Sequence, residues 1–519
     1  MRLGKISIVF LLVLLAPRVF AQTTDISGKY EGTADIQGLG KLAVSVEIRR
    51  KDGKISGAFQ TPLGEAPIID GSFQDGILRL TLDAGGDDIF VSGKTGADGG
   101  IAGEISGSVG KGTFELKRTG DATPEAETKI VLEQTAEKWR EDLRFLASEL
   151  PKRHKNAFHR ITRAGFEKMV AELDAKIPTL SNVEIVMGLA RIVAHIGDGH
   201  TGLGWGWAFQ RVPFSVFWFG KELRVVQVSK ELPRLNGARL VKIGGVPVEK
   251  VYERARDYIS QGESEQFVLN ASTYLFTYPV WLKTAGLAKD DGAAVYEFTD
   301  AKGKKFSLAI KTLPRGAVKD WLVPYKQTPL HLQKPDAPFY FEYLPGAKTV
   351  YVNFRWYPRR AEFRKFSAEL FDFIDKTPVE KLVFDLRQNG GGDFTRGRDF
   401  FIKPLKERKK FMERGRLFVL AGRVTFSAGM SNTADFRNDL KAIIVGEPTG
   451  ARPNGYQENR GFSLPNSHLT VSYSIEFYKF SDTDTPGILP DHRIEPDWQS
   501  FAAGRDPALE WILAYPNGE

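Results

Sequence analysis

The most constraining feature of this sequence is the stretch 416–450, in which two apolar runs flank a serine-containing turn and a helical pattern. The first run, 417–421, has the length and composition of a buried strand, and a turn containing glycine follows it. Ser427 comes next, ahead of a segment with helical character and a second apolar run at 442–445. Strand, turn, helix and strand make a βαβ unit, so we expect Ser427 where the turn becomes the helix.

A serine in that place has two interpretations. Its hydroxyl can act as a nucleophile, because the backbone N–H groups at the start of a helix have no intrahelical partner and can stabilise an oxyanion. It can equally be an ordinary N-cap, a role that serine fills well. These residues alone leave both interpretations of Ser427 open.

The first 21 residues indicate an export signal. They have a basic start, an apolar centre, and small residues at Val19 and Ala21 that suit cleavage before Gln22. The apolar part is short for a membrane span, and no later stretch is long enough to be one. The chain has no cysteine, which excludes a disulfide framework. We expect a soluble exported protein, periplasmic or secreted.

The charge of the chain argues against nucleic-acid binding. The signal carries three positive charges and no acid, which leaves +5 of the full-length +8, and both signs are mixed along the chain. With 519 residues, 42% of them hydrophobic, several cored domains are expected.

Residues 26–118 consist of short alternating runs separated by Gly- and Asp-containing turns, a pattern typical of an antiparallel β sandwich or barrel. This segment has no His or Cys and no catalytic-looking cluster, so we expect an accessory or docking domain. Residues 119–130 have the composition of a linker.

Residues 131–200 change to a helical period and predict three amphipathic helices, the third starting at a capping box formed by Ser181 and Glu184. A turn of small residues follows and contains His200, which can project into a cleft or remain a surface side chain. Among the seven histidines His200 has the most site-like surroundings. We assign His154, His159 and His195 to helix surfaces or loops.

Residues 211–315 return to strands. A strand, a Gly-Gly turn at 244–245, a short strand and a helix are typical of a PDZ-like module, which would capture peptides by strand addition. A small β-rich linker domain with a similar turn explains the same pattern.

Residues 336–519 predict an α/β domain. Its apolar strand 381–386 is followed directly by three glycines, 390–392, which free the backbone to direct N–H groups at a ligand. An oxyanion hole is one interpretation. A phosphate-binding loop is weaker, because the Gly-Lys-Ser/Thr ending is missing.

Four motifs together carry a family resemblance. LVFDLRQNGGG, then VTFSAG, then IIVGEPTG and finally GILPD resemble the C-terminal-processing (tail-specific) and tricorn-core serine peptidases, over 131–500 and most clearly over 338–495. The resemblance implies a crotonase-like α/β core at 336–519, with a helical segment at 131–200 and a PDZ-like domain at 211–315. The β domain at 26–118 lies outside it.

The resemblance also implies a choice between two catalytic arrangements. In the processing branch a lysine is the base, but Arg452 stands in the corresponding stretch and arginine stays protonated in proteins. In the tricorn-like branch the base is a histidine, and His200 falls at the matching place. The late acid of that branch matches Asp484, with Asp482 as a rival, and the serine that precedes the base is Gly199 here.

The resulting hypothesis is an exported serine peptidase acting on polypeptides. Ser427 would attack a peptide carbonyl, His200 would serve as general base, and Asp484 would support the site. Backbone N–H groups of Ala428 and of Gly391 or Gly392 would hold the oxyanion. No metal or organic cofactor is implied. The alternatives are a non-catalytic peptide- or small-ligand-binding protein on the same scaffold and an acyl or ester hydrolase.

Overall fold

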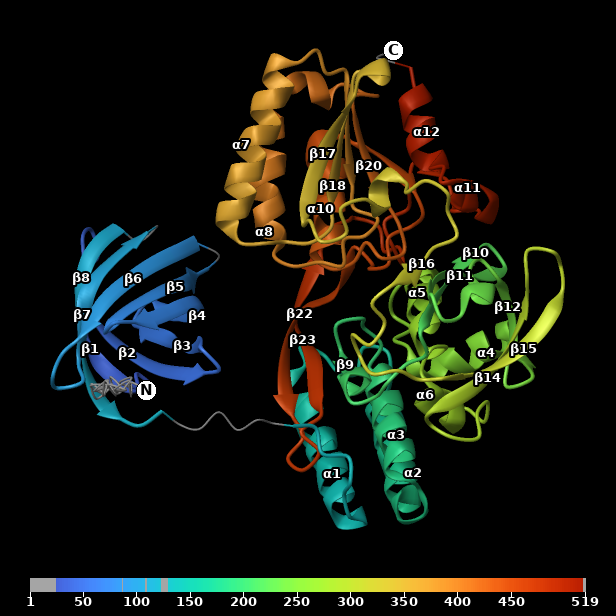
Figure 1. Ribbon diagram of the computed structural model, residues 1–519, viewed down its shortest axis with the longest axis horizontal. Coiled ribbons are helices and arrows are strands. Elements are labelled where there is room, and N and C mark those ends of the chain that lie inside the picture. The colour runs from blue at the N-terminus through green and yellow to red at the C-terminus, as the bar shows by residue number, and fades with distance from the viewer. Residues whose placement is uncertain (1–24, 86, 108–109, 123–128, 517–519) are drawn as a thin grey trace, which may run out of the picture. The chain divides into compact units, whose positions relative to one another are not determined.

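The computed structural model describes residues 25–85, 87–107, 110–122 and 129–516 (Figure 1). The expected signal segment, 1–21, and residues 123–128 of the expected linker, 119–130, lie outside these residues. The chain divides into two compact units, 1–126 and 127–519. No helix in the described part of the chain is both long and apolar enough to cross a bilayer.

The first unit contains a closed antiparallel barrel of eight strands in sequence order, with β1 also pairing with β8. The alternating sequence pattern allowed a sandwich or a barrel, and the barrel is the form observed. Alternate side chains point inward and form a separate hydrophobic core. The strands are β1 (Gly28–Ile36), β2 (Gly40–Lys51), β3 (Lys54–Thr61), β4 (Gly64–Gln74), β5 (Ile77–Ala84), β6 (Asp87–Thr95), β7 (Ile101–Gly107) and β8 (Gly110–Gly120).

The second unit begins with three helices, α1 (Ala136–Arg153), α2 (Arg163–Lys176) and α3 (Asn182–Ala194). Helix α3 starts at the predicted capping box, in which Ser181 and Glu184 each bind the other's backbone N–H. The chain then turns through His200 into the short strand β9 (Gly202–Leu203). Strand β9 pairs with a hairpin from much later in the chain, β22 (Asn454–Ser463) and β23 (Thr470–Lys479).

A seven-stranded sheet follows the helices, with three helices between its strands. Strand β10 is at one end of the sheet order. The elements are β10 (Phe214–Phe219), β11 (Glu222–Ser229), β12 (Arg239–Ile243), β13 (Val246–Pro247), α4 (Val248–Ala255), α5 (Glu265–Leu275), α6 (Pro279–Thr284), β14 (Ala293–Thr299), β15 (Lys305–Lys311) and β16 (Trp321–Leu322).

The last part of the unit is a mixed six-stranded sheet in which β18, β19, β20, β21 and β24 are parallel and β17 is antiparallel. Its elements are β17 (Phe339–Leu344), β18 (Thr349–Phe354), α7 (Arg360–Lys376), β19 (Lys381–Asp385), α8 (Phe394–Gly397), α9 (Lys403–Glu407), β20 (Leu417–Ala421), α10 (Ala428–Leu440), β21 (Ile443–Gly446), β24 (His492–Arg493), α11 (Trp498–Ala503) and α12 (Pro507–Ala514).

Helices cover both faces of this sheet. Apolar side chains of α7 and α10 pack on one face, and those of α12 pack on the other. Because β19 and β20 are adjacent and parallel, the loops that leave their carboxyl ends lie beside each other. One loop contains the three glycines and the other leads to Ser427, so the sheet itself brings these two motifs together.

Candidate active site

Ser427 lies at the start of helix α10, as the sequence predicts, but it does not cap the helix. Its side chain makes no capping hydrogen bond to the first turn. Its backbone has φ 49° and ψ −125°, a conformation that costs a non-glycine residue about 1–3 kcal/mol and is concentrated at functional sites. Ser427 therefore stands at the N-cap position, but the interpretation that its hydroxyl caps the helix is wrong.

The hydroxyl of Ser427 instead meets the imidazole of His200. The distance from Ser427 Oγ to His200 Nε2 is 2.9 Å, between residues 227 positions apart in the chain. The ring of Phe426 lies beside the imidazole, with 4.7 Å between the ring centroids. Folding thus joins the turn after α3 to the turn before α10.

Burial determines the charge state of His200. Desolvation lowers the pKa of the imidazole from 6.5 to about 4, because the charged form loses water that the surrounding groups do not replace. The negative charge of Asp198 and the backbone of Tyr456 oppose this change, but no described residue makes a well-aligned hydrogen bond with the buried Nδ1. At neutral pH His200 is uncharged, and its Nε2 can accept a proton from Ser427.

The glycine loop packs directly against Ser427. Gly391 has φ +116°, and a Cβ built on it would lie 2.7 Å from the Cβ of Ser427. The buried Asn389 fastens this loop to the serine turn: its side-chain oxygen accepts from the N–H of Gly391 at 3.0 Å, and its carbonyl accepts from the N–H of Phe426 at 2.9 Å. The loop therefore requires glycine at 391 for both space and backbone conformation.

Under the serine-peptidase hypothesis drawn from the sequence, replacing Gly391 with alanine is expected to displace Ser427 and lower casein hydrolysis about 100-fold, the usual cost of a misplacement of about 1 Å. Gly390→Ala is the matched control, because a Cβ at Gly390 meets nothing within 4 Å. Casein hydrolysis by both variants measures the effect. Equal rates in the two variants would show that the contact between Gly391 and Ser427 has no part in turnover.

The expected oxyanion donors differ in their availability. The N–H of Gly391 already donates to Asn389. Within the described chain, no group accepts a hydrogen bond from the N–H of Ala428, in the first turn of α10, or from that of Gly392. Of the three N–H groups expected from the sequence, those of Ala428 and Gly392 thus have no acceptor among the described residues, whereas that of Gly391 has one.

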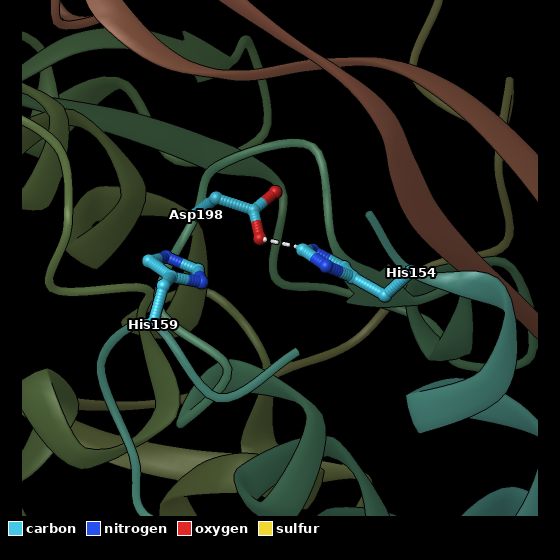
Figure 2. Close-up of side chains that lie close together, drawn as sticks. All are labelled: His154, His159 and Asp198. Atoms are coloured by element: carbon cyan, nitrogen blue, oxygen red, sulfur yellow. Dashed lines mark hydrogen bonds and ion pairs between the residues drawn. The ribbon is translucent and has the colours of Figure 1, made fainter. Parts of the chain in front are cut away.

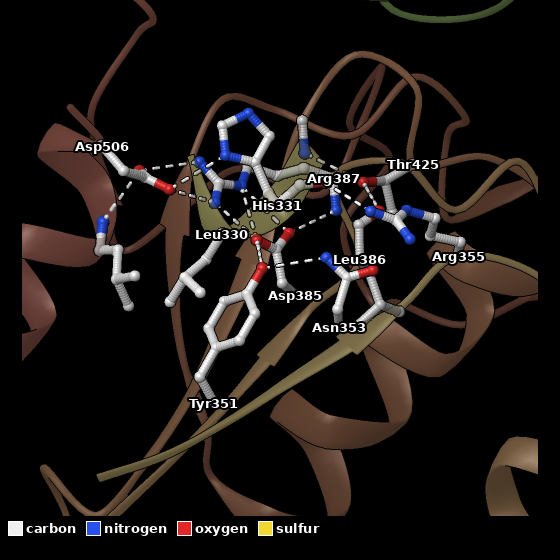
Figure 3. Close-up of polar contacts among 12 residues, drawn as sticks. Leu330, His331, Tyr351, Asn353, Arg355, Asp385, Leu386, Arg387, Thr425 and Asp506 are labelled. Atoms are coloured by element: carbon white, nitrogen blue, oxygen red, sulfur yellow. Dashed lines mark hydrogen bonds and ion pairs between the residues drawn. The ribbon is translucent and has the colours of Figure 1, made fainter. Parts of the chain in front are cut away.

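The residues before the glycines form an ion network at the end of strand β19 (Figure 3). Arg387 binds Asp385 through Nε at 3.0 Å and Asp506 through Nη2 at 2.6 Å, and the hydroxyl of Tyr351 donates to Asp385 at 2.7 Å. Desolvation alone would lower the pKa of Arg387, but the two carboxylates raise it well above its ordinary value. This part of the motif anchors the start of the glycine loop and makes no contact with Ser427.

The buried His154 and Asp198 lie close to the half-buried His159 (Figure 2). These three residue types can bind a metal ion, and their ligand atoms lie within 4.8 Å of one another. The hydrogen bonds argue otherwise. The backbone N–H of Asn156 donates to His154 Nδ1, so His154 Nε2 carries the proton that it donates to Asp198 at 2.9 Å. His154 then has no lone pair for a metal, and the cluster is better described as a hydrogen-bond network.

Asp198 links this network to the candidate base. One of its oxygens accepts from the hydroxyl of Ser474 at 2.6 Å and from the backbone N–H of His200 at 3.2 Å, while the other binds His154. Burial would raise the pKa of Asp198, but the hydrogen bonds from His154 and Ser474 bring it below its ordinary value. Asp198 is therefore ionised and fixes the turn that presents His200.

Asp484, the acid expected from the sequence, makes no hydrogen bond or ion pair with His200 in the described part of the chain. Its side chain is 71% exposed, and its carboxylate binds Arg452 Nη2 at 2.8 Å. Asp482 is fully exposed and lies 3.8 Å from Lys479. Both acids lie on the segment after β23, and the link from Asp484 toward the site runs through Arg452.

Glu263 is the buried acid that connects Arg452 to the His200 turn. Its two oxygens accept from the backbone N–H of Arg452 at 2.9 Å and of Gly199 at 3.0 Å. Desolvation raises the pKa of Glu263 to about 7 despite these hydrogen bonds. The link from Asp484 to His200 therefore passes through Arg452, Glu263 and Gly199.

Sequence reasoning missed three groups at this site. His154 was expected on a helix surface or loop, but it is buried, because its ring pairs with Asp198. Asp198 lies two residues before His200 in the sequence, so its nearness to the candidate base could have identified it. Nothing in the sequence pointed to Glu263, because the backbone N–H groups that it binds, those of Gly199 and Arg452, lie 64 and 189 positions away.

No protein-family model matches this chain, and no curated protein matches it. Solved structures do. A mutant of CPAF aligns with a TM-score of 0.50 and 13% identity, covering 73% of this chain and 96% of that chain. CPAF complexed with lactacystin aligns with a TM-score of 0.49 and 13% identity, covering 73% and 97%. A photosystem II D1 C-terminal processing protease aligns with a TM-score of 0.34 and 14% identity, covering 72% and 98%. At these identities the likeness concerns the fold alone, and the chain is structurally similar to CPAF over about three quarters of its length.

Proposed function

We propose that this chain is an exported serine peptidase that hydrolyses peptide bonds in polypeptides, with Ser427 as nucleophile and His200 as general base. The observation that carries the proposal is the 2.9 Å contact between Ser427 Oγ and the neutral His200 Nε2. A hydroxyl within hydrogen-bond reach of a base, at the start of a helix and beside free N–H groups, is the arrangement that acyl transfer requires.

The mechanism follows from this geometry. Ser427 Oγ attacks the carbonyl carbon of the substrate as its proton passes to His200 Nε2, and the oxyanion is held by the N–H groups of Ala428 and Gly392. Removing one such donor typically costs about 10²–10³ in rate. His200 then gives the proton to the leaving amine, and the C–N bond breaks. Water, deprotonated by His200, hydrolyses the acyl-enzyme and restores Ser427.

We assign Asp198 and Asp484 the role of positioning the turn that contains His200. Asp198 holds the backbone of His200, and Asp484 supports the same turn from further away, through Arg452 and Glu263. This assigns Asp484 the role of a positioning residue, while Ser427 and His200 carry the chemistry.

We also propose where the polypeptide substrate binds. We assign 336–519 as a crotonase-like core and 211–315 as a PDZ-like domain. A cavity of about 610 Å³ lies where β10 and α5 approach the loops after β19 and β20, and it is lined by Ser215, Phe217, Asn270 and Tyr274 among others. Because β10 is an edge strand, a peptide can add to it there. Neither Ser427 nor His200 lines this cavity, so it would bind substrate at a distance from the scissile bond.

A fluorophosphonate probe tests the proposal, because it reacts covalently with activated serine hydroxyls. We expect labelling of the wild-type chain and of Ser431→Ala, and none of Ser427→Ala. Ser431 is the matched control: it is buried one turn further along α10, and its hydroxyl donates to the carbonyl of Ser427. Absence of wild-type labelling would favour a binding protein, and labelling without hydrolysis of casein would favour an ester or other acyl hydrolase.

The pH profile gives an independent check on His200. A base must be unprotonated to accept a proton, so kcat/KM should fall on acidification with the pKa of His200 in the free enzyme. That pKa is lowered to about 4, so we expect the His200 limb to have its midpoint near 4, well below the ordinary 6.5. Burial raises the pKa of Glu263 to about 7, so any loss of turnover caused by its protonation would be centred near pH 7, above the His200 limb. A midpoint near 6.5, measured with a substrate that does not itself titrate there, would contradict the buried, neutral His200.

A further inference from the structure

The interior of the N-terminal barrel is filled unevenly from one end to the other. The turns β2–β3, β4–β5 and β6–β7 lie at one end, and β1–β2, β3–β4 and β5–β6 lie at the other, because the strands run up and down in sequence order. Eight strands enclose a space that side chains can fill or that can hold one small ligand.

The first end of the barrel is closed. Tyr30, Ile48, Leu78, Ile101 and Leu116 meet there and are each at most 2% exposed. The hydroxyl of Tyr30 donates to the carbonyl of Ile26 at 2.9 Å, so this buried polar group is satisfied. Packed apolar side chains leave no passage at this end.

The opposite half of the barrel is hollow. A cavity of about 350 Å³ lies among inward-facing side chains that include Ile36, Val44, Phe59, Ile89 and Phe114. Its volume lies within the range of small-molecule sites, about 300–1,000 Å³. Apolar cavities of smaller size remain dry and bind apolar molecules, because water gains few hydrogen bonds inside them.

The lining and the mouth limit the chemistry of the occupant. No lysine, arginine or histidine of the described chain lines this cavity, and Glu65 is the one acid among its lining residues. An anionic ligand would therefore have no cation to pair with. Leu39 and Leu63, on the β1–β2 and β3–β4 turns, are 44% and 67% exposed and line the same cavity. Two exposed leucines at the tips of turns make an apolar entrance to an apolar cavity.

We propose that the N-terminal barrel is a binding site for one uncharged, apolar small molecule, which enters between the β1–β2 and β3–β4 turns. Binding removes apolar surface of both the cavity and the ligand from water, which favours the bound state. The site uses no residue of the second unit. It is therefore independent of the proposed peptidase function and is expected to be intact in Ser427→Ala.

The test titrates the full chain with N-phenyl-1-naphthylamine, an uncharged apolar dye that fluoresces when it leaves water. We expect one saturable site per chain, displaced by 1-decanol and at least tenfold less effectively by decanoate. Ala84→Phe should weaken dye binding at least tenfold, because Ala84 lines the cavity. Ala102→Phe is the matched control, since Ala102 is an exposed barrel alanine outside the lining.

Each outcome decides the proposal. Absence of saturable binding to the wild-type chain would overturn it, as would equal dye affinity in Ala84→Phe and Ala102→Phe, which would place the dye elsewhere. Preferential displacement by decanoate would refute the uncharged ligand. If circular dichroism shows that Ala84→Phe is unfolded, Ala66→Leu takes its place, because Ala66 lines the cavity from a different strand and the added volume is smaller.

Discussion

Ser427→Ala is expected to lower casein hydrolysis by about 10⁴-fold or more. Without the Oγ there is no acyl-enzyme, and the remaining rate comes only from substrate binding and the oxyanion donors. Substrate affinity should change little, because the hydroxyl contributes mainly to the transition state. Initial rates with fluorescently labelled casein, compared with binding of the same casein under conditions of no turnover, separate the two effects.

Ser431→Ala again serves as the control and should hydrolyse casein within a few-fold of the wild-type rate. Thermal melts of both variants establish that the fold is intact; alanine retains the Cβ, so position 427 keeps its strained positive-φ backbone in Ser427→Ala. Parent-level hydrolysis by a folded Ser427→Ala protein would refute the nucleophile and, with it, the peptidase proposal.

His200→Ala is expected to have an effect of similar size, with casein binding retained. The serine hydroxyl is a poor nucleophile unless a neighbouring base takes its proton. Because Ser427 and His200 act as one unit, the double variant should be no slower than the slower single variant, so the two losses should not add. Rates of the wild type, both single variants and the double variant, measured at one pH, form the double-mutant cycle that tests this.

His195→Ala is the histidine control. His195 ends helix α3 only five positions before His200, but its ring pairs with Asp257 and is 35% exposed. Its loss should leave turnover near the wild-type rate. Additive losses in the cycle would mean that His200 and Ser427 contribute separately, which a shared proton transfer does not allow.

Local pattern predicts the elements of this chain well where burial follows a regular period. The apolar run 417–421 is strand β20, and Ser427 lies at the junction of turn and helix. The capping box at Ser181 and Glu184 starts α3. These features depend on neighbours within about one turn or one strand, so the sequence alone contains the necessary information.

Contacts between residues that are far apart in the sequence could not be predicted from local pattern. The alternation of 26–118 is the same for a sandwich and a barrel, and only the pairing of β1 with β8 closes the barrel. His154 is next to Asp198 in space but 44 positions away in sequence, and Glu263 reaches the His200 turn from 64 positions away. Hydrogen-bond partners of buried polar groups are chosen by the packed fold, and no periodicity records them.

Residue type and local pattern were enough to identify the candidate residues: a serine at a strand-to-helix junction, glycines after a buried strand, and a histidine in a small-residue turn. Tertiary structure alone decided that Ser427 faces an imidazole rather than capping its helix, that Asp198 and Glu263 hold the histidine turn, and that the barrel is hollow at one end. The physical reason is that chemical identity is a property of each residue, whereas burial and contact arise only when distant segments exclude water together.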